Sequence, residues 1–293
     1  MGALIGLIGR YPPPVVVEPQ TPLVNVLRGL KNRAVRHALV QEEGRLVGII
    51  SARDILRDLV RAEDRTLSQL NERLARDVMT RDVVTVSFEE GFARLVEKFL
   101  EHDLGTIPVV GAKGKAVGVV SERHIVDALS GHVTYVRVGE IASSPLLTAD
   151  AGSTLFDAIA KMVEFNIRRV PFIGETGSLV GIITLKDVVS LLGSWRTVEA
   201  IEVGRGGEIS DTPLDPTWRC SIASIDSKVD VSEALKKMRS LGVGSLLVRD
   251  GDQIVGIVTE RDVVRKLPKV MGADVFVDAV RQEVFVGRIS KYG

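Results

Sequence analysis

Cysteine is nearly absent from the sequence, since Cys220 is the only one among 293 residues. A single cysteine excludes an intramolecular disulfide and a metal site built from several thiolates, and it favours a reducing, cytoplasmic setting. Cys220 lies beside an apolar stretch with no neighbouring base, so we interpret it as a buried structural thiol rather than a nucleophile. The four histidines form no i,i+4 pair and no other spacing typical of a metal site. These absences argue against an enzyme and against a bound metal.

Neither charge sign is in excess, because 38 Lys and Arg residues balance 38 Asp and Glu residues. The two halves of the chain, divided near residue 133, are each close to neutral. Nucleic acid is therefore disfavoured as a partner, since its binding requires a concentrated positive face. Long apolar runs are missing as well, and no run reaches the length of a membrane helix, so we expect no membrane insertion.

The chain contains a repeated string instead. GIISARDIL begins at Gly48, GVVSERHIV at Gly118, GIITLKDVV at Gly181 and GIVTERDVV at Gly256. Each string joins a short apolar strand to a hydroxyl residue that can begin a helix. Recurrence at this interval indicates a tandem repeat of one small unit.

The third copy shows the order of elements within the unit. A strand at 146–150 precedes a helix at 153–166, whose apolar face contains Leu155, Ile159, Met162 and Val163. Two further strands at 167–173 and 179–184 lead to a second helix at 185–192. The same order in all four copies predicts an α/β (α+β) fold of four β-α-β-β-α units.

The repeats divide the chain as follows: repeat 1 at 1–68, repeat 2 at 69–134, repeat 3 at 135–196, a connector at 197–216, repeat 4 at 217–267 and an extension at 268–293. A unit this small cannot bury its apolar faces alone, and the connectors favour pairing of repeats 1 with 2 and 3 with 4. We expect the connector, with its GRGGE stretch, to be flexible and to be held to the body by Trp195 and Trp218. The extension is expected to add a strand or helix that packs on a module, or to form an oligomer contact.

The repeated unit resembles the CBS domain, and the resemblance covers almost the whole chain. It rests on the lead-in DVMT (77–80), the second strands LGTIPVV and IRRVPFI, and the four glycine-initiated strings. The resemblance implies two tandem modules, each made of two repeats packed through their sheets, which can assemble into a flat disc. Clefts in such modules commonly bind AMP, ADP, ATP or S-adenosylmethionine, and the modules regulate other proteins without catalysis.

We therefore expect a cytoplasmic, non-catalytic regulatory protein that senses adenine nucleotides, needs no cofactor, forms a homodimer and controls an unknown protein. A sensor of S-adenosylmethionine or a related adenosine ligand is one alternative. An interaction scaffold with vestigial sites is another.

The repeated strings allow two interpretations of their polar residues. A hydroxyl followed three residues later by an acid is typical of a capping box and needs no ligand. Capping boxes usually carry Glu or Gln, however, whereas three copies carry Asp54, Asp187 and Asp262. The resemblance implies that these aspartates hold ribose, beside helix N-termini suited to phosphate. Because His124 replaces the aspartate in repeat 2, we expect an empty or altered site there.

The second strands supply the other predicted contacts. Ile167, Val170 and Pro171 form an apolar wall for adenine, and the adjacent arginines are either phosphate ligands or a solvated strand edge. Repeat 4 lacks such cations and must borrow them, from Arg261 or from its partner repeat. We expect the best site between repeats 3 and 4, where both repeats carry the aspartate. The predicted nucleotide-binding residues are Arg36, His37, Ser51, Asp54, Thr85, Ser121, Arg123, Thr148, Ile167, Arg168, Arg169, Val170, Pro171, Thr184, Asp187, Thr259, Glu260, Arg261 and Asp262.

Overall fold

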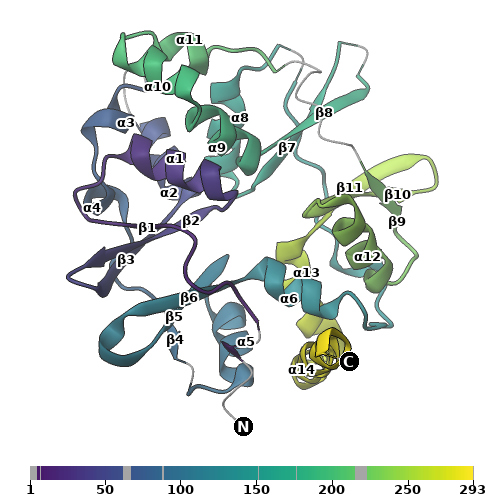
Figure 1. Cartoon of the computed structure of the whole chain (residues 1–293). Coiled ribbons are helices and arrows are strands. Elements are labelled where there is room, and N and C mark those ends of the chain that lie inside the picture. Colours follow the sequence, from purple (N-terminus) through teal and green to yellow (C-terminus); the bar gives the residue numbers. More distant parts are fainter. Residues whose placement is uncertain are drawn as a thin grey trace.

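Four small sheets with helices packed on them make up the chain, which confirms the predicted α/β class (Figure 1). The computed structural model describes residues 5–6, 8–61, 67–87, 89–150, 152–175, 177–214 and 223–292, with side chains given through 282 and at 284. Cys220 and Trp218 lie outside the described residues. Figure 1 shows the four repeats arranged around a common centre.

Repeats 1 and 2 have all five predicted elements. Repeat 1 consists of β1 (Val16–Val17), α1 (Leu23–Arg33), β2 (His37–Glu42), β3 (Arg45–Ser51) and α2 (Ala52–Arg61). Two short helices follow, α3 (Gln69–Glu72) and α4 (Ala75–Val78). Repeat 2 consists of β4 (Val86–Ser87), α5 (Phe92–Glu101), β5 (Thr106–Val110), the 3-10 turn η2 (Ala112–Gly114), β6 (Ala116–Ser121) and α6 (Glu122–Leu129).

Repeat 3 departs from the prediction at its first strand. After α7 (Val138–Ile141) it consists of α8 (Leu155–Glu164), β7 (Arg169–Ile173), β8 (Leu179–Thr184) and α9 (Leu185–Leu192). The predicted strand at 146–150 is reduced to one parallel bridge between Ala149 and Phe172. The sheet of this repeat therefore has two strands, because too few residues of the segment pair with β7.

Repeat 4 again has the five elements, namely β9 (Ser224–Asp226), α12 (Val231–Leu241), β10 (Ser245–Asp250), β11 (Gln253–Thr259) and α13 (Glu260–Met271). The remaining helices are α10 (Trp195–Glu202), α11 (Gly206–Ser210) and α14 (Ala273–Tyr292). Among the described residues, no helix is both long and apolar enough to cross a membrane.

The four sheets share one register. The second strand pairs antiparallel with the third in every repeat. In each pair the register shifts at a β-bulge directly after the second-strand residue that lies opposite the glycine of the string. In repeats 1, 2 and 4 the first strand runs parallel to the second. The common register places the hydroxyl residue that ends each third strand at the same edge of its unit.

In repeats 1, 2 and 4 the glycine of the string makes room for a crossing segment, whereas Gly181 of repeat 3 makes room for the ring of Phe172 on the neighbouring strand β7. Arg10 bridges Val119 in β6, Thr80 bridges Ile49 in β3, and Ser143 bridges Ile257 in β11. The lead-in of one repeat thus lies on the third strand of its paired repeat. At Gly256 an added Cβ would lie 2.5 Å from the Ser143 carbonyl oxygen, so no side chain fits under the crossing segment.

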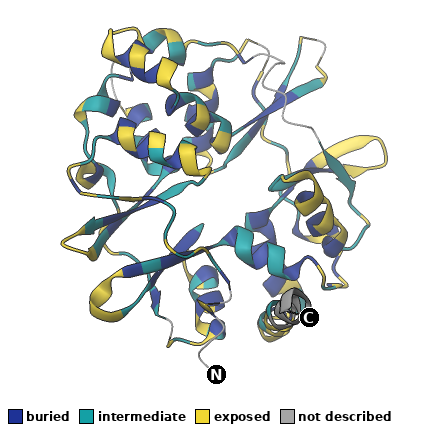
Figure 2. Cartoon of the chain, viewed as in Figure 1, coloured by how far each residue is buried: buried dark blue, intermediate teal, exposed yellow. Residues whose placement is uncertain are grey.

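The hydrophobic cores join the repeats differently from the predicted pairs. One core joins repeat 1 to repeat 3, through contacts of α2 with α8 and of α1 with α9, and the other joins repeat 2 to repeat 4 around α6 and α13. Repeats 1 and 2 meet through a smaller sheet contact that contains Leu39 and Val119. The predicted pairing of repeats 1 and 2 is therefore found at the sheets, while the helices bury the larger apolar surfaces across the pairs (Figure 2).

The connector forms helices, so the expectation of a flexible segment is wrong for its described part. Helix α11 packs on α8 and α10, and an added Cβ at Gly206 would lie 3.1 Å from the Leu67 backbone nitrogen. Trp195 does not pin the connector, since 65% of the residue is exposed and Arg196 stacks on its ring. The glycines of the connector suggested flexibility, but Gly206 is present because another segment packs closely against it.

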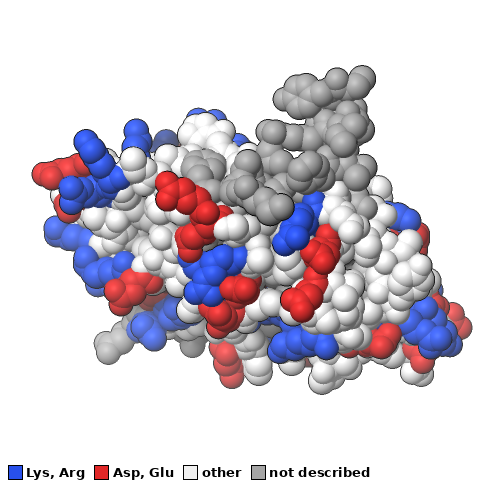
Figure 3. All heavy atoms as spheres, turned by 90° about the horizontal axis from the view of Figure 1, so that it is seen from below, with Lys and Arg blue, Asp and Glu red and all other residues white. Residues whose placement is uncertain are grey.

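The extension contributes a helix. Pro268 lies inside α13, and α14 packs on α5, α6 and α13 with Phe276, Ala279 and Val280 buried. Figure 3 shows Lys and Arg side chains interspersed with Asp and Glu on the face that it displays, without a large area of either sign.

Candidate functional site

In each repeated string, the hydroxyl residue and the residue three positions later form a hydrogen-bonded capping box at the start of a helix. In repeat 3, the Thr184 backbone N–H and hydroxyl donate to Asp187 Oδ2 at 2.8 and 2.6 Å, and the Asp187 N–H donates to Thr184 Oγ1 at 3.3 Å. The Ser51–Asp54 and Thr259–Asp262 pairs make the same three bonds. The capping interpretation is therefore correct for one carboxylate oxygen of each aspartate.

In repeat 2, His124 completes the box with its ring. The Ser121 backbone N–H donates to His124 Nδ1 at 3.0 Å, which assigns the ring proton to Nε2. Burial lowers the pKa of His124, so the ring is neutral near pH 7. Repeat 2 thus keeps the cap while it replaces a carboxylate acceptor with an N–H donor.

An equivalent box outside the strings shows that aspartate alone is not a ligand signal. At the start of α8, the Thr154 N–H and hydroxyl each donate to Asp157 Oδ2 at 2.8 Å. This box is exposed and borders none of the three cavities described below. What distinguishes Asp54, Asp187 and Asp262 is therefore their place beside a cavity and not the choice of aspartate.

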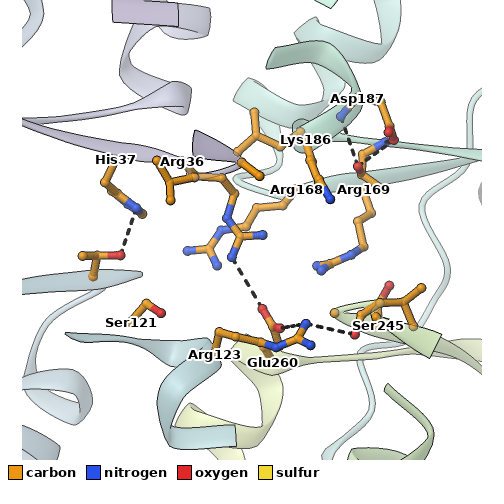
Figure 4. Close-up of a pocket in the computed structure, with 18 of the residues that line it drawn as sticks. Arg36, His37, Ser121, Arg123, Arg168, Arg169, Lys186, Asp187, Ser245 and Glu260 are labelled. Atoms are coloured by element: carbon orange, nitrogen blue, oxygen red, sulfur yellow. Dashed lines mark hydrogen bonds and ion pairs between the residues drawn. The ribbon is translucent and has the colours of Figure 1, made fainter. Parts of the chain in front are cut away.

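A central cavity of about 470 Å³ receives residues from all four repeats (Figure 4). It gathers, of the predicted residues, Arg36, His37, Ser121, Arg123, Arg168, Arg169, Thr184, Asp187 and Glu260. In Figure 4, the guanidinium groups of Arg36, Arg168 and Arg169 lie between Asp187 on one side and Ser121 on the other. Its size is that of a small-molecule site.

Two smaller cavities of about 300 Å³ each contain the other aspartates. The Asp262 cleft, between repeats 3 and 4, is lined among others by Ile167, Arg168, Arg169, Pro171, Thr259, Arg261 and Asp262. The Asp54 cleft, between repeats 1 and 2, is lined among others by Arg36, His37, Ser51, Asp54 and Arg168. We expected Asp187 and Asp262 to share one site. They do not, because their helices open into different cavities.

Three predicted residues line none of these cavities. Val170 is fully buried in the core. The carbonyl oxygens of Thr85 and Thr148 accept hydrogen bonds from Lys98 Nζ and Lys161 Nζ, each at 2.7 Å. Their contacts are with their own repeats.

The arginines of the second strands lie inside the molecule, so the alternative of a solvated strand edge is wrong. Arg168 pairs with Glu122, and the side chains of the two residues are 11% and 1% exposed. Arg168 also lines all three cavities. It is thus placed to sense an anion in any of them.

Glu260 organises two more arginines at the central cavity. Its carboxylate accepts from Arg123 at 3.0 Å and lies 3.5 Å from Arg36, and its side chain is only 4% exposed. Arg169 makes no hydrogen bond or ion pair with any described residue, and burial lowers its pKa to about 10. Glu260 therefore holds Arg36 and Arg123 in place, whereas Arg169 feels the charge of Glu260 without an ion pair to it and can meet an anion.

An alternation of arginine and glycine explains how repeat 4 borrows its cations. In each repeat, one residue of the second strand pairs with the hydroxyl residue that ends the third strand. The residue just before that partner is Arg36 in repeat 1 and Arg168 in repeat 3, but Gly105 in repeat 2 and Gly244 in repeat 4. A Cβ at Gly105 would meet Arg168, and one at Gly244 would meet Arg169. The repeat alignment contains this signal, and sequence reasoning missed its meaning.

A second charged cluster was also missed by sequence reasoning. Asp103 of repeat 2 pairs with Arg261 and Arg265 of repeat 4 and accepts from Asn166 of repeat 3 at 3.0 Å. Asn166 in turn accepts from Arg53 of repeat 1. The cluster joins all four repeats beside the Asp54 and Asp262 clefts. Within the described part of the chain, no group of His, Cys, Asp and Glu could hold a metal ion.

Comparison with known proteins agrees with this architecture. The family model of the CBS domain matches residues 8–61, 75–131, 138–194 and 219–269. An uncharacterised 33.4 kDa protein in a ribosomal RNA operon of Thermofilum pendens is 33% identical over 294 residues, which cover 97% of each chain.

Protein MJ1225 of Methanocaldococcus jannaschii is similar in both sequence and structure. Its sequence is 27% identical over 265 residues, which cover 86% of this chain and 94% of that protein. Its crystal structure, described as that of a proposed archaeal homologue of g-AMPK, superposes with a TM-score of 0.77 at 24% identity, covering 89% of this chain and 98% of that one. With four matched domains over most of its length, the chain belongs to the CBS-domain family.

Proposed function

We propose that the chain is a non-catalytic regulatory protein that binds adenine nucleotides between its CBS repeats and transmits their binding to a partner protein. The observation that carries the proposal is the position of three carboxylates. Asp54, Asp187 and Asp262 each begin a helix that faces a cavity lined by arginines. A carboxylate can accept hydrogen bonds from ribose hydroxyls, while the helix N-terminus and the arginines favour phosphate.

The charge of the central cavity favours a nucleotide over S-adenosylmethionine. Arg36, Arg123, Arg168 and Arg169 line this cavity, and among the described residues that line it the carboxylates are Asp187 and Glu260, while Glu122 pairs with Arg168 from outside the lining. S-adenosylmethionine carries a sulfonium and an ammonium against a single carboxylate, so its net positive charge adds to that of the cavity. A nucleotide neutralises the Arg169 guanidinium.

The position of the cavities supports the proposed transmission. Each cavity is lined by residues of two or more repeats, so a bound ligand stabilises the arrangement of repeats that it bridges. A partner that prefers one arrangement is then bound more or less tightly when ligand is present. The homodimer and the regulated protein are part of this proposal.

Calorimetric titration with AMP, ADP and ATP tests the proposal. Asp187→Asn and Asp262→Asn keep an acceptor for the cap and remove the carboxylate charge. We expect each change to weaken binding at its own cavity by about 10- to 150-fold, the range for losing a charge-assisted hydrogen bond.

Asp157→Asn is the matched control, because it alters the same box where no cavity lies. It should bind nucleotides like the wild type. Unchanged affinity in both site variants, or equal losses in all three variants, would contradict the assignment. A melting temperature unmoved by millimolar nucleotide would favour a scaffold with vestigial sites.

A further inference from the structure

The two ends of the central cavity have opposite hydrogen-bonding character. At one end Asp187 presents a carboxylate beside Thr184. At the other end His124 lies beside Ser121, and its Nδ1 is already used by the Ser121 N–H. The group that His124 can offer to a ligand is therefore the Nε2–H donor. A ribose needs an acceptor for its hydroxyls, whereas a phosphate needs donors.

The surface between the two ends is cationic. Six cationic side chains line the cavity, namely Arg10, Arg36, Arg123, Arg168, Arg169 and Lys186. Of the two lining carboxylates, Glu260 is bound to Arg36 and Arg123, and Asp187 lies at the far end from Ser121. The guanidinium of Arg169 has no hydrogen-bond or ion-pair partner among the described residues. The middle of the cavity is thus suited to a chain of phosphates.

We propose that the central cavity binds one nucleoside triphosphate, with its ribose at Asp187, its phosphates along Arg169 and Arg36, and its terminal phosphate at His124. The inference rests on the proposed function, because it takes nucleotide binding at Asp187 as given. It adds that repeat 2 has exchanged a ribose site for a phosphate site. The cavity therefore discriminates by phosphate-chain length, and it does not hold two monophosphates.

Two variants of equal shape test this assignment. His124→Asn and His124→Asp each supply an oxygen that caps the Ser121 N–H, but the first offers an N–H donor to the cavity and the second a carboxylate. Both are made in a chain that also carries Asp54→Asn and Asp262→Asn, so that the central cavity is the one that keeps its helix-capping aspartate. AMP and ATP are titrated by calorimetry, with tripolyphosphate as competitor, and melting temperatures check that each variant is folded.

We expect ATP to bind more tightly than AMP in the parent chain and in His124→Asn, with tripolyphosphate displacing ATP. In His124→Asp the preference for ATP should fall by about tenfold or more, because a donor is exchanged for a repelling charge. A second AMP should also bind, since the new carboxylate can accept from ribose.

Two results would overturn the inference, and only the second would also remove the proposed function at this cavity. An equal ATP preference in the two His124 variants, with AMP binding still dependent on Asp187, removes only the role of His124. Absence of any nucleotide binding in the parent chain removes the proposed function at this cavity as well.

Discussion

The glycine and the hydroxyl of each repeated string have separate physical roles. The hydroxyl caps a helix, and in repeats 1, 2 and 4 the glycine allows the lead-in segment of the paired repeat to cross the sheet. At Gly256 the crossing atom is the Ser143 carbonyl oxygen, which is backbone and cannot rotate away. A side chain here must therefore displace the contact between repeats 3 and 4.

We predict that Gly256→Ala lowers the free energy of unfolding by about 1–3 kcal/mol, the usual cost of overpacking. Gly207→Ala is the control, because no described atom outside its chain neighbours and the backbone of its own helix lies within 4 Å of an added Cβ there. It should be neutral or slightly stabilising, since alanine favours a helix. Urea denaturation measures both variants, and equal effects would refute the crossing-segment explanation.

The two histidines at the central cavity should make stability depend on pH. Burial is the largest cause that lowers the pKa of His37 and of His124 below the ordinary value of 6.5. The unfolded chain therefore binds protons at higher pH than the folded chain, and stability falls as pH drops below about 6.5.

Urea denaturation between pH 8 and pH 5.5 measures this dependence. Above about pH 7 these histidines should contribute no pH dependence to the free energy of unfolding. Below pH 7 the free energy of unfolding should fall by up to about 1.4 kcal/mol per pH unit for each histidine. A chain with His37→Gln and His124→Asn should lose this slope. A wild-type stability that rises on acidification would show that the histidines are not held neutral.

At the scale of elements, the sequence predicted helices and strands well where an apolar period was present. The buried face of α8 contains Leu155, Ile159 and Met162, as expected. The prediction failed in the connector, where glycine suggested flexibility. Gly206 instead lies against the Leu67 backbone, and α11 is held by packing with α8 and α10. Contacts between segments far apart in sequence are absent from local composition.

Helix α14 belongs to the core of repeats 2 and 4, although no repeat includes it. Phe276 is 0% exposed there, while Phe165 at the end of α8 is 46% exposed. We predict that Phe276→Ala lowers the free energy of unfolding by about 3–5 kcal/mol, as other buried phenylalanines do.

Phe165→Ala provides the comparison and should change stability by about 0.5 kcal/mol or less. Thermal or urea unfolding gives both values. A Phe276→Ala chain as stable as Phe165→Ala would mean that α14 does not contribute to the core.

On the scale of the whole molecule, the order of repeats in sequence differs from the order of burial. The connectors pointed to pairs 1 with 2 and 3 with 4, and the crossing segments at Thr80 and Ser143 agree. The large cores nevertheless join 1 with 3 and 2 with 4. The sequence could not predict this, because every helix has a similar apolar stripe and nothing local selects its partner.

For the candidate site, the sequence predicted many of the lining residues but not which of them share a cavity. The capping residues are visible in the repeated strings and Arg36, Arg168 and Arg169 at the second strands, but the way these residues are divided among the cavities is not visible in the sequence. Asp187 and Asp262 separate because their helices open on different cavities, and Arg168 reaches all three. The Asp103 cluster was missed because its members come from four repeats and have no common motif.

We predict that Asp103→Asn weakens the association of the four repeats. The residue pairs with Arg261 and Arg265, but its side chain is 45% exposed, so the loss should be modest, about 1 kcal/mol. The loss should shrink at an ionic strength of about 1 M, where surface charges are screened.

Glu97→Gln removes an exposed ion pair with Arg94 inside the single helix α5 and is the control. It should have little effect at either salt concentration. Thermal unfolding monitored for both variants, at low and high salt, separates the two cases. Equal behaviour of the two variants would show that the cluster does not hold the repeats together.

Native mass spectrometry of the chain with AMP and with ATP tests the central claim most directly. The wild type should bind up to three nucleotides, one for each of Asp54, Asp187 and Asp262, and a chain with all three changed to Asn should bind none at the same concentration. A wild type that binds no nucleotide, or a triple variant that binds as many as the wild type, would contradict the account.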